Sequence, residues 1–461
     1  MMEKKYLIWF VVGVVFAFII RILLTPYGNH WDLTVNTDWS EWIHFNGPYG
    51  FYENRVWIYI GPSQLPLINL IYGFNYVIFE KILWLITAVK SFLTIHNVLP
   101  GIFKYWFNFE TWFDTYYSNT QFKIGQIISM KLIPIFTDIV IGLVIFILGS
   151  KYINRKKALL ASLLYLFIPY TFYISSLWGQ YDQLSALCLL LSFCFIYIGK
   201  ESVGKLKNWY LPLSIIFYFI SVEVKPTAFF TAPFYVYYIL KQKPRLWCLI
   251  LSSLVGLELF LITTIPFTKG NPFSYTIKTI IPIVFNEGRN ITSTHAFNLW
   301  GLISPIEQGS LNYSVLGIKA ILWSYLFLTI LNVISIFIIS KRDNLKSMFI
   351  GLFIITGGFY IFTTGMLDRY YFTGLIFFLI LTMFYKKTLL LWLSAALLFS
   401  LNLFFSFGYP YSMNFNLLNV FWVNYPLVRI LSLLQLILFV LMVIISLKNN
   451  ISIERNRSRI K

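Results

Sequence analysis

Long apolar segments separated by short basic clusters are the feature that most constrains how this chain can fold. Apolar runs of about 20 residues span a bilayer as α-helices, because only helices and closed barrels satisfy all backbone hydrogen bonds in lipid. With 58% hydrophobic and only 12% charged residues, the chain fits this class. We therefore predict an all-α polytopic membrane protein with about twelve transmembrane helices. The expected spans are residues 7–24, 125–148, 158–176, 183–199, 209–223, 227–240, 246–266, 316–340, 348–363, 371–385, 388–404 and 427–446.

The basic residues predict the orientation of these helices. The net charge is +18, and most Lys and Arg residues lie in short clusters between apolar runs. Such clusters are typical of cytoplasmic loops, so they indicate a lipid bilayer as the partner and exclude nucleic acid. Both termini are expected in the cytoplasm, including a basic tail over residues 447–461. We expect an integral multi-pass protein, in the plasma membrane if the chain is prokaryotic.

Polar sequence is concentrated on the opposite face of the predicted membrane domain, which covers residues 1–461. A long first external loop (25–124) follows the first span, and a second external loop covers residues 267–315. Residues 63–89 are apolar enough to span, but a full crossing there would move the cluster at 151–157 to the outer face. We therefore expect an interfacial or re-entrant helix in this segment.

Ionisable residues near hydrocarbon are costly and are usually retained for a function. In this chain most of them are predicted on or towards the outer face, where acids could activate a nucleophile and bases could hold an anion. Asp138 is the exception, and we expect it to link two helices. The stretches of interest are Asp32 to Trp39, Lys131, Trp178 to Asp182, Glu223 to Pro226, Arg289 to Trp300 and Asp368 to Tyr370.

These stretches, taken in order, resemble the multi-spanning GT-C glycosyltransferases. The likeness is nearest to prokaryotic mannosyltransferases related to GPI mannosyltransferase II, and it extends to about residue 385. The motifs that carry it are Asp32 followed seven residues later by Trp39, then KLIPIFTD, WGQYD, Lys225-Pro226, RNITSTHAFNLW and MLDRYYF. This chain departs from the family at Leu367, where the family often has histidine.

The resemblance implies an inverting glycosyltransferase with a polyprenyl- or dolichyl-phosphate-linked hexose, expected to be mannose, as donor. The acceptor would be a glycan or glycolipid hydroxyl at the outer face, and Asp32 would be the catalytic base. The expected substrate-binding residues are Asp38, Trp39, Trp178, Gln180, Asp182, His295 and Asn298. The expected donor phosphate-binding residues are Lys131, Lys225, Arg289, Arg369 and Tyr370.

Structural roles compete with several of these assignments. Asp32 could be a loop or capping acid, Asp182 begins an apolar run as helix caps do, and Arg369 could extend to lipid headgroups. No nucleotide-binding motif is present, and we expect no cofactor and no metal. A polytopic transporter or lipid flippase is the alternative function, although no internal repeat is evident.

Overall fold

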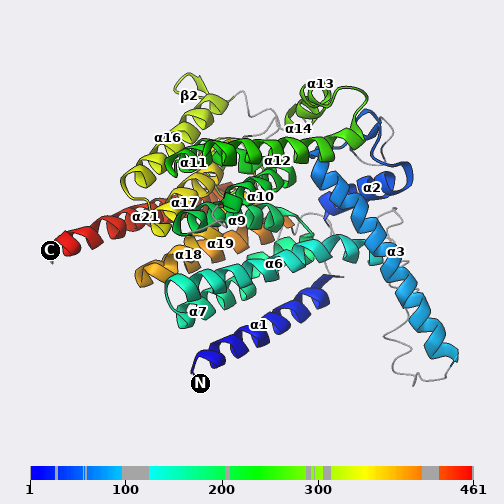
Figure 1. Ribbon diagram of the computed structural model, residues 1–461, viewed down its shortest axis with the longest axis horizontal. Coiled ribbons are helices and arrows are strands. Elements are labelled where there is room, and N and C mark those ends of the chain that lie inside the picture. The colour runs from blue at the N-terminus through cyan, green and yellow to red at the C-terminus, as the bar shows by residue number, and fades with distance from the viewer. Residues whose placement is uncertain are drawn as a thin grey trace.

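The computed structural model describes residues 2–25, 30–54, 57, 60–95, 124–202, 208–286, 292–294, 296–304, 313–407 and 425–458. These residues are almost entirely helical, with two short two-stranded sheets (Figure 1). The helices of the first half are α1 (Met2–Leu24), α2 (Trp31–Asn46), η2 (Phe51–Glu53), α3 (Pro66–Ile95), α6 (Ile124–Tyr152), α7 (Arg155–Phe167), α8 (Pro169–Phe172), η3 (Tyr173–Trp178), α9 (Asp182–Glu201), α10 (Tyr210–Val224), η5 (Pro226–Thr231) and α11 (Ala232–Lys241).

The second half continues the same architecture. Its helices are α12 (Leu246–Thr264), η6 (Ile265–Phe267), α13 (Pro272–Tyr275), η7 (Thr276–Ile280), α14 (Ile281–Asn286), α15 (Leu299–Ile303), α16 (Ala320–Lys341), α17 (Leu345–Phe362), η9 (Asp368–Tyr371), α18 (Phe372–Phe384), η10 (Lys386–Thr388), α19 (Leu389–Phe407) and α21 (Tyr425–Ser458). The strands are β1 (Ser293–Thr294), parallel to β4 (Met366–Leu367), and β2 (Ser314–Val315), antiparallel to β3 (Ile318–Lys319).

Among the described residues, seven helices are long and apolar enough to cross a membrane. They lie in α1, α6, α9, α12, α16, α17 and α21, and an eighth span arises if the bent pair formed by α7 and α8–η3 is counted as one. Each of the twelve expected runs contains helix, but α10, α11 and α18 have only 15, 10 and 13 residues, fewer than a crossing needs. The chain is therefore an all-α membrane protein, and the expected number of twelve spans exceeds the number that the helix lengths support.

The bend between α7 and α8 has a local cause in the sequence. Pro169 disfavours helical geometry at the residue before it, and Ile168 is accordingly extended, with φ −70° and ψ 136°. The two helical segments meet at 51°. The bend directs the end of η3, and the WGQYD turn that follows it, towards α2.

Helices α17 and α18 are buried over almost their whole length and belong to the main core of the bundle. Small residues allow their backbones to approach closely: a Cβ on Gly374 would lie 2.8 Å from the Cα of Gly357. Such contacts are typical of helix packing in membranes, where lipid removes the hydrophobic drive for association. In contrast, α1, α12 and α21 expose much of their apolar surface, as helices that face lipid do.

The basic clusters lie together at one end of the bundle. Lys157 donates from Nζ to the Met383 carbonyl (2.8 Å), Lys241 to that of Ser340 (2.8 Å), and Lys200 pairs with Asp343 (3.1 Å). These contacts join the start of α7 to the ends of α9, α11, α16 and α18. The start of α1 and the end of α21 also lie towards this side in Figure 1, whereas α2 and α14 lie at the other end.

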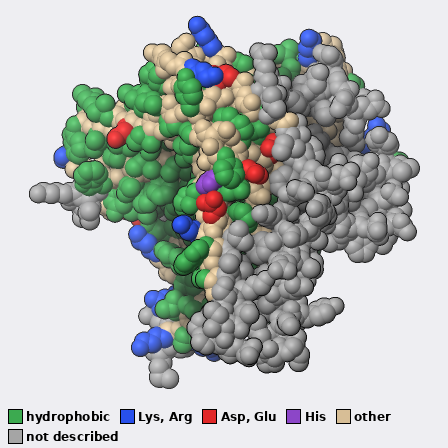
Figure 2. Space-filling model, turned by 90° about the vertical axis from the view of Figure 1, so that its right-hand side faces the viewer, with side chains coloured by type: hydrophobic (Ala, Val, Ile, Leu, Met, Phe, Trp, Pro, Cys, Tyr) green, Lys and Arg blue, Asp and Glu red, His purple; other side chains and the backbone are tan. Residues whose placement is uncertain are grey.

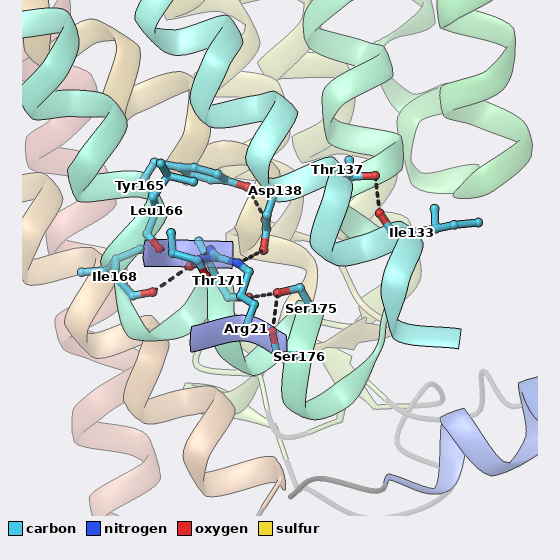
Figure 3. Close-up of polar contacts among 11 residues, drawn as sticks. Arg21, Ile133, Thr137, Asp138, Tyr165, Leu166, Ile168, Thr171, Ser175 and Ser176 are labelled. Atoms are coloured by element: carbon cyan, nitrogen blue, oxygen red, sulfur yellow. Dashed lines mark hydrogen bonds and ion pairs between the residues drawn. The ribbon is translucent and has the colours of Figure 1, made fainter. Parts of the chain in front are cut away.

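A buried ion pair fixes α1 against α6 (Figure 3). Arg21 Nε lies 3.1 Å from Asp138 Oδ2, and both side chains are fully buried. The guanidinium also donates to the Leu166 carbonyl (2.9 Å) and to Thr171 Oγ1 (3.0 Å), while Tyr165 donates its hydroxyl to Asp138 (2.6 Å). Asp138 thus links helices, and the bend between α7 and α8 supplies two of the acceptors for Arg21.

Breaking this pair is expected to destabilise the protein strongly. Asp138→Leu leaves the Arg21 charge buried without its carboxylate, a change that costs about 3–5 kcal/mol. The double variant Arg21→Met/Asp138→Leu removes both charges and is expected to unfold much closer to the wild type. Denaturant titration in detergent measures both. Equal losses in the single and double variants would contradict this account of the pair.

Candidate functional site

A cavity of about 490 Å³ lies at the end of the bundle opposite the basic clusters. Six separate parts of the chain enclose it: α2, the segment before α3, the turn before α9, the junction of α10 with η5, α14, and the segment from Gly365 to η9. Its polar and charged lining residues are Asp32, Asn36, Ser63, Gln64, Gln180, Lys225, Thr227, Arg369 and Tyr370. Viewed from this end, hydrophobic side chains cover much of the described surface, and acidic and histidine side chains gather near the centre (Figure 2).

Helix α2 presents one face to the cavity. Asp32, Val35, Asn36 and Trp39 all line it, and their spacing of three, four and seven residues places them on one side of an α-helix. The Asp32 amide donates to His30 Nδ1 (3.1 Å), so His30 caps the start of α2. Trp39 is buried and donates from Nε1 to the Ile60 carbonyl (3.0 Å). The helix therefore holds the Asp32 carboxylate at the cavity wall.

Arg369 is the central cation of the site. Its Nη2 lies 3.1 Å from Asp32 Oδ2, and its Nε lies 3.7 Å from Asp182 Oδ2. Asp368, the preceding residue, lies 3.9 Å from Nη1. The guanidinium also lies over the Trp178 ring, 5.0 Å from its centroid. Because the side chain is 9% exposed, these contacts operate in a setting with little water, where charge interactions are strong.

Lys225 provides a second buried cation beside the first. Its Nζ lies 3.1 Å from Asp182 Oδ2 and 5.1 Å from the centroid of the Tyr370 ring. Asp182, the first residue of α9, thus contacts both cations of the site. Two cations and three carboxylates form one connected network at the base of the cavity.

The turn between η3 and α9 depends on Gly179. This residue has φ +73°, and a Cβ there would lie 2.9 Å from Lys131 Cγ and 3.1 Å from Leu33 Cδ1. Glycine is therefore required both by the left-handed backbone and by the close packing. The turn places Gln180 so that Nε2 donates to Asp32 Oδ2 (2.9 Å).

The charges around Asp32 keep its carboxylate ionised. Burial by itself would raise the pKa of Asp32, but Arg369, His30 and Lys225, with a hydrogen bond from Trp178, outweigh that effect and lower it below its ordinary value. Burial by itself would lower the pKa of Arg369, but the charges of Asp32 and Asp182 outweigh that effect and raise it. The pKa of His30 is lowered, chiefly by burial. At neutral pH the site therefore contains an ionised carboxylate beside a charged guanidinium.

Most of the residues predicted from the sequence meet at this site. Asp32, Trp39, Gln180, Lys225, Arg369 and Tyr370 line the cavity, and Trp178 and Asp182 contact its cations. Arg289 and His295 lie outside the described residues. His30, Asn36 and Gln64 were not singled out, although the spacing of Asp32, Asn36 and Trp39 would have identified Asn36.

Three predicted contact residues, Asp38, Lys131 and Asn298, neither line this cavity nor form a described contact with its cations. Lys131 is fully buried and donates from Nζ to the Thr25 carbonyl (2.7 Å), so it supports the chain behind the site. Asn298 caps α15 by accepting from the Gly301 amide (2.8 Å) and donates to the Tyr360 carbonyl (3.1 Å). Asp38 follows Asp32 by six residues, which rotates it about 240° around α2, away from the cavity.

No protein-family model matches this chain, and no curated protein matches it significantly. Among the described residues, no group of three or more His, Cys, Asp or Glu side chains is placed to hold a metal ion.

Proposed function

We propose that the protein is an inverting glycosyltransferase that moves a hexose from a polyprenyl-phosphate donor to an acceptor hydroxyl. The observation that carries the proposal is the direct contact of Asp32 with Arg369 in a cavity that also contains Lys225. A carboxylate that takes a proton and cations that stabilise a leaving phosphate are the two requirements of this reaction. The order of sequence motifs supports the same class, and mannose is the hexose it favours.

Asp32 is the proposed general base. It takes the proton of the acceptor hydroxyl as that oxygen attacks the anomeric carbon, and the bond from this carbon to the phosphate oxygen breaks on the opposite face. Its position in the first turn of α2, with Gln180 on the same oxygen as Arg369, fixes the direction of the carboxylate. One displacement at the anomeric carbon gives inversion.

Arg369 and Lys225 are the proposed phosphate-binding residues. Guanidinium groups bind phosphate oxygens through two parallel hydrogen bonds, and an ammonium adds a compact charge. An entering lipid phosphate competes with Asp32 and Asp182 for these cations. Donor binding thus weakens the ion pair between Arg369 and Asp32. The carboxylate becomes more basic before it takes the proton of the acceptor.

The arrangement of charge supports an active site on the external face. Clusters of Lys and Arg mark the cytoplasmic side of membrane proteins, and those of this chain lie at the end of the bundle away from the cavity. The donor would reach the cavity from the outer leaflet, with glycan or glycolipid as the acceptor.

A transporter or lipid flippase is the second candidate. Broken helices whose ends meet at a binding site are common in transporters, and the bent pair α7 and α8–η3 ends at this cavity. Purified protein in liposomes with radiolabelled polyprenyl-phosphate mannose and glucose separates the two functions. Transfer of label to an acceptor supports the enzyme, whereas label that crosses the bilayer with the donor intact supports transport.

The network also predicts a pH dependence. Because the pKa of Asp32 is lowered, its carboxylate is ionised above the ordinary carboxyl pKa, and the stability that it contributes is fully present there. Both are lost as the pH falls through the lowered value. Lys225→Gln removes one of the charges that lower this pKa. The acid limb of kcat/KM, which reports the free enzyme, is therefore expected to move to higher pH. An unmoved acid limb would contradict the electrostatic role of Lys225.

A further inference from the structure

A second cavity, of about 680 Å³, lies at the basic end of the molecule. Helix α9 begins at Asp182 beside the first cavity and ends at Glu201 beside the second. A helix of this length separates them by about 30 Å. The second cavity is enclosed by the end of α9, the start of α10, and the turn that joins α11 to α12.

The lining of this cavity combines apolar walls with a basic rim. Phe195, Leu211 and Ile239 are among the wall residues, and the charged lining residues are Lys200, Lys243 and Arg245. Lys200 is already paired with Asp343 (3.1 Å), which also accepts from Gln242 (3.3 Å). Lys243 and Arg245 are exposed, and within the described part of the chain no carboxylate forms an ion pair with either.

The turn that carries Lys243 and Arg245 has an unusual backbone. Lys243 has φ +48°, a left-handed conformation that is unfavourable for a residue with a Cβ. Pro244, which follows, has a fixed φ and restricts its neighbour further. The turn therefore holds Lys243 and Arg245 on the same rim, and strained residues of this kind often mark binding sites.

Exposed tryptophans place the rim at the depth of lipid headgroups. Trp209 and Trp247 are 59% and 45% exposed, and each lies next to a rim segment in the chain. Tryptophan is enriched at the boundary between headgroups and hydrocarbon. A ligand that enters this cavity therefore approaches from the membrane interface, with apolar walls on one side and cations on the other.

We propose that this cavity binds the phosphate headgroup of an anionic phospholipid. Lys243 and Arg245 contact the phosphate, and the glycerol and upper acyl segments pack against the apolar walls. Basic pockets between helices on the cytoplasmic side of membrane proteins bind anionic headgroups through the same combination. The proposal is independent of the function assigned to the first cavity.

Native mass spectrometry of the purified full-length protein tests this proposal. Protein in detergent is supplied with equal amounts of dioleoyl phosphatidylglycerol and dioleoyl phosphatidylcholine. We expect preferential retention of phosphatidylglycerol, weakened about 30-fold in Lys243→Gln/Arg245→Gln, the combined effect of two cations at headgroup depth. The charge-conserving variant Lys243→Arg/Arg245→Lys should retain the lipid. Retention would show that loss of charge, and not substitution in the turn, weakens binding in the glutamine variant.

A control variant and a control ligand test whether the effect is specific to this cavity and to a lipid. Lys156→Gln/Lys387→Gln removes two exposed cations at the same end that do not line the cavity, and it should bind phosphatidylglycerol like the wild type. Inorganic phosphate should not raise the melting temperature of the protein. Equal loss in both glutamine variants, equal retention of the two lipids, or stabilisation by inorganic phosphate equal to that by phosphatidylglycerol would each overturn the proposal.

Discussion

Asp32→Asn is expected to lower kcat for sugar transfer by about 10²–10⁴-fold, the range that general-base catalysis contributes. The amide keeps the size of the side chain and the capped start of α2, but it cannot take the proton of the acceptor. Arg369 retains Asp182 and Asp368 as partners, so the variant should fold. Initial rates of transfer from radiolabelled polyprenyl-phosphate mannose to glycolipid acceptor, with melting temperatures in parallel, measure the effect.

Asp343→Asn is the matched control for this experiment. Asp343 pairs with Lys200 at the opposite end of the bundle and has no contact with the cavity. It should leave transfer unchanged. If Asp32→Asn retains wild-type rates, or if both variants lose activity equally, Asp32 is not the base.

Arg369→Lys is expected to lower transfer by about 10²–10³-fold, comparable with the loss of a group that stabilises a developing anion. Lysine keeps the positive charge but lacks the planar fork that binds two phosphate oxygens at once. The stacking over Trp178 would also be lost. The loss should appear in kcat as well as KM, because the charge on the phosphate grows as the bond to the sugar breaks.

Arg155→Lys, at the start of α7 and far from the cavity, provides the corresponding control and should behave as the wild type. The donor also gives an independent readout. A ligand that binds only the folded protein raises its stability, so polyprenyl-phosphate sugar should raise the melting temperature of the wild type more than that of Arg369→Lys. An identical rise in both would contradict the assignment of Arg369 to the phosphate.

The predicted class of fold, an all-α membrane protein, is confirmed, whereas the number of twelve spans stays a prediction. Apolar runs locate helices well, and each expected run contains helix. Their lengths depend on features that hydropathy does not show. Pro169 bends one run by 51°, and residues 227–240 divide between η5 and α11. Hydropathy also gives no partner for Arg21, which lies within the first run and pairs with Asp138, 117 residues later in the chain.

The site was predictable where charge alone determines position. Asp32, Lys225 and Arg369 are ionisable residues next to apolar segments at one predicted face, and burial of charge is tolerated only where charges meet. Lys131 satisfied the same criterion from the sequence, and Asn298 lies in one of the polar stretches predicted at that face. Their side chains instead hydrogen-bond to nearby backbone, at Thr25, Gly301 and Tyr360. Whether a polar side chain lines a site or hydrogen-bonds to backbone depends on local packing, which the spacing of residues in the sequence does not reveal.

The most direct test of the proposed function is the anomeric configuration of the product. Purified protein in liposomes is given polyprenyl-phosphate mannose and a glycolipid acceptor, and the new linkage is determined by NMR. We predict a glycosidic bond whose configuration is opposite to that of the donor, formed by the wild type and not by Asp32→Asn. A product that retains the donor configuration, or donor that crosses the bilayer unchanged without a new bond, would contradict the account.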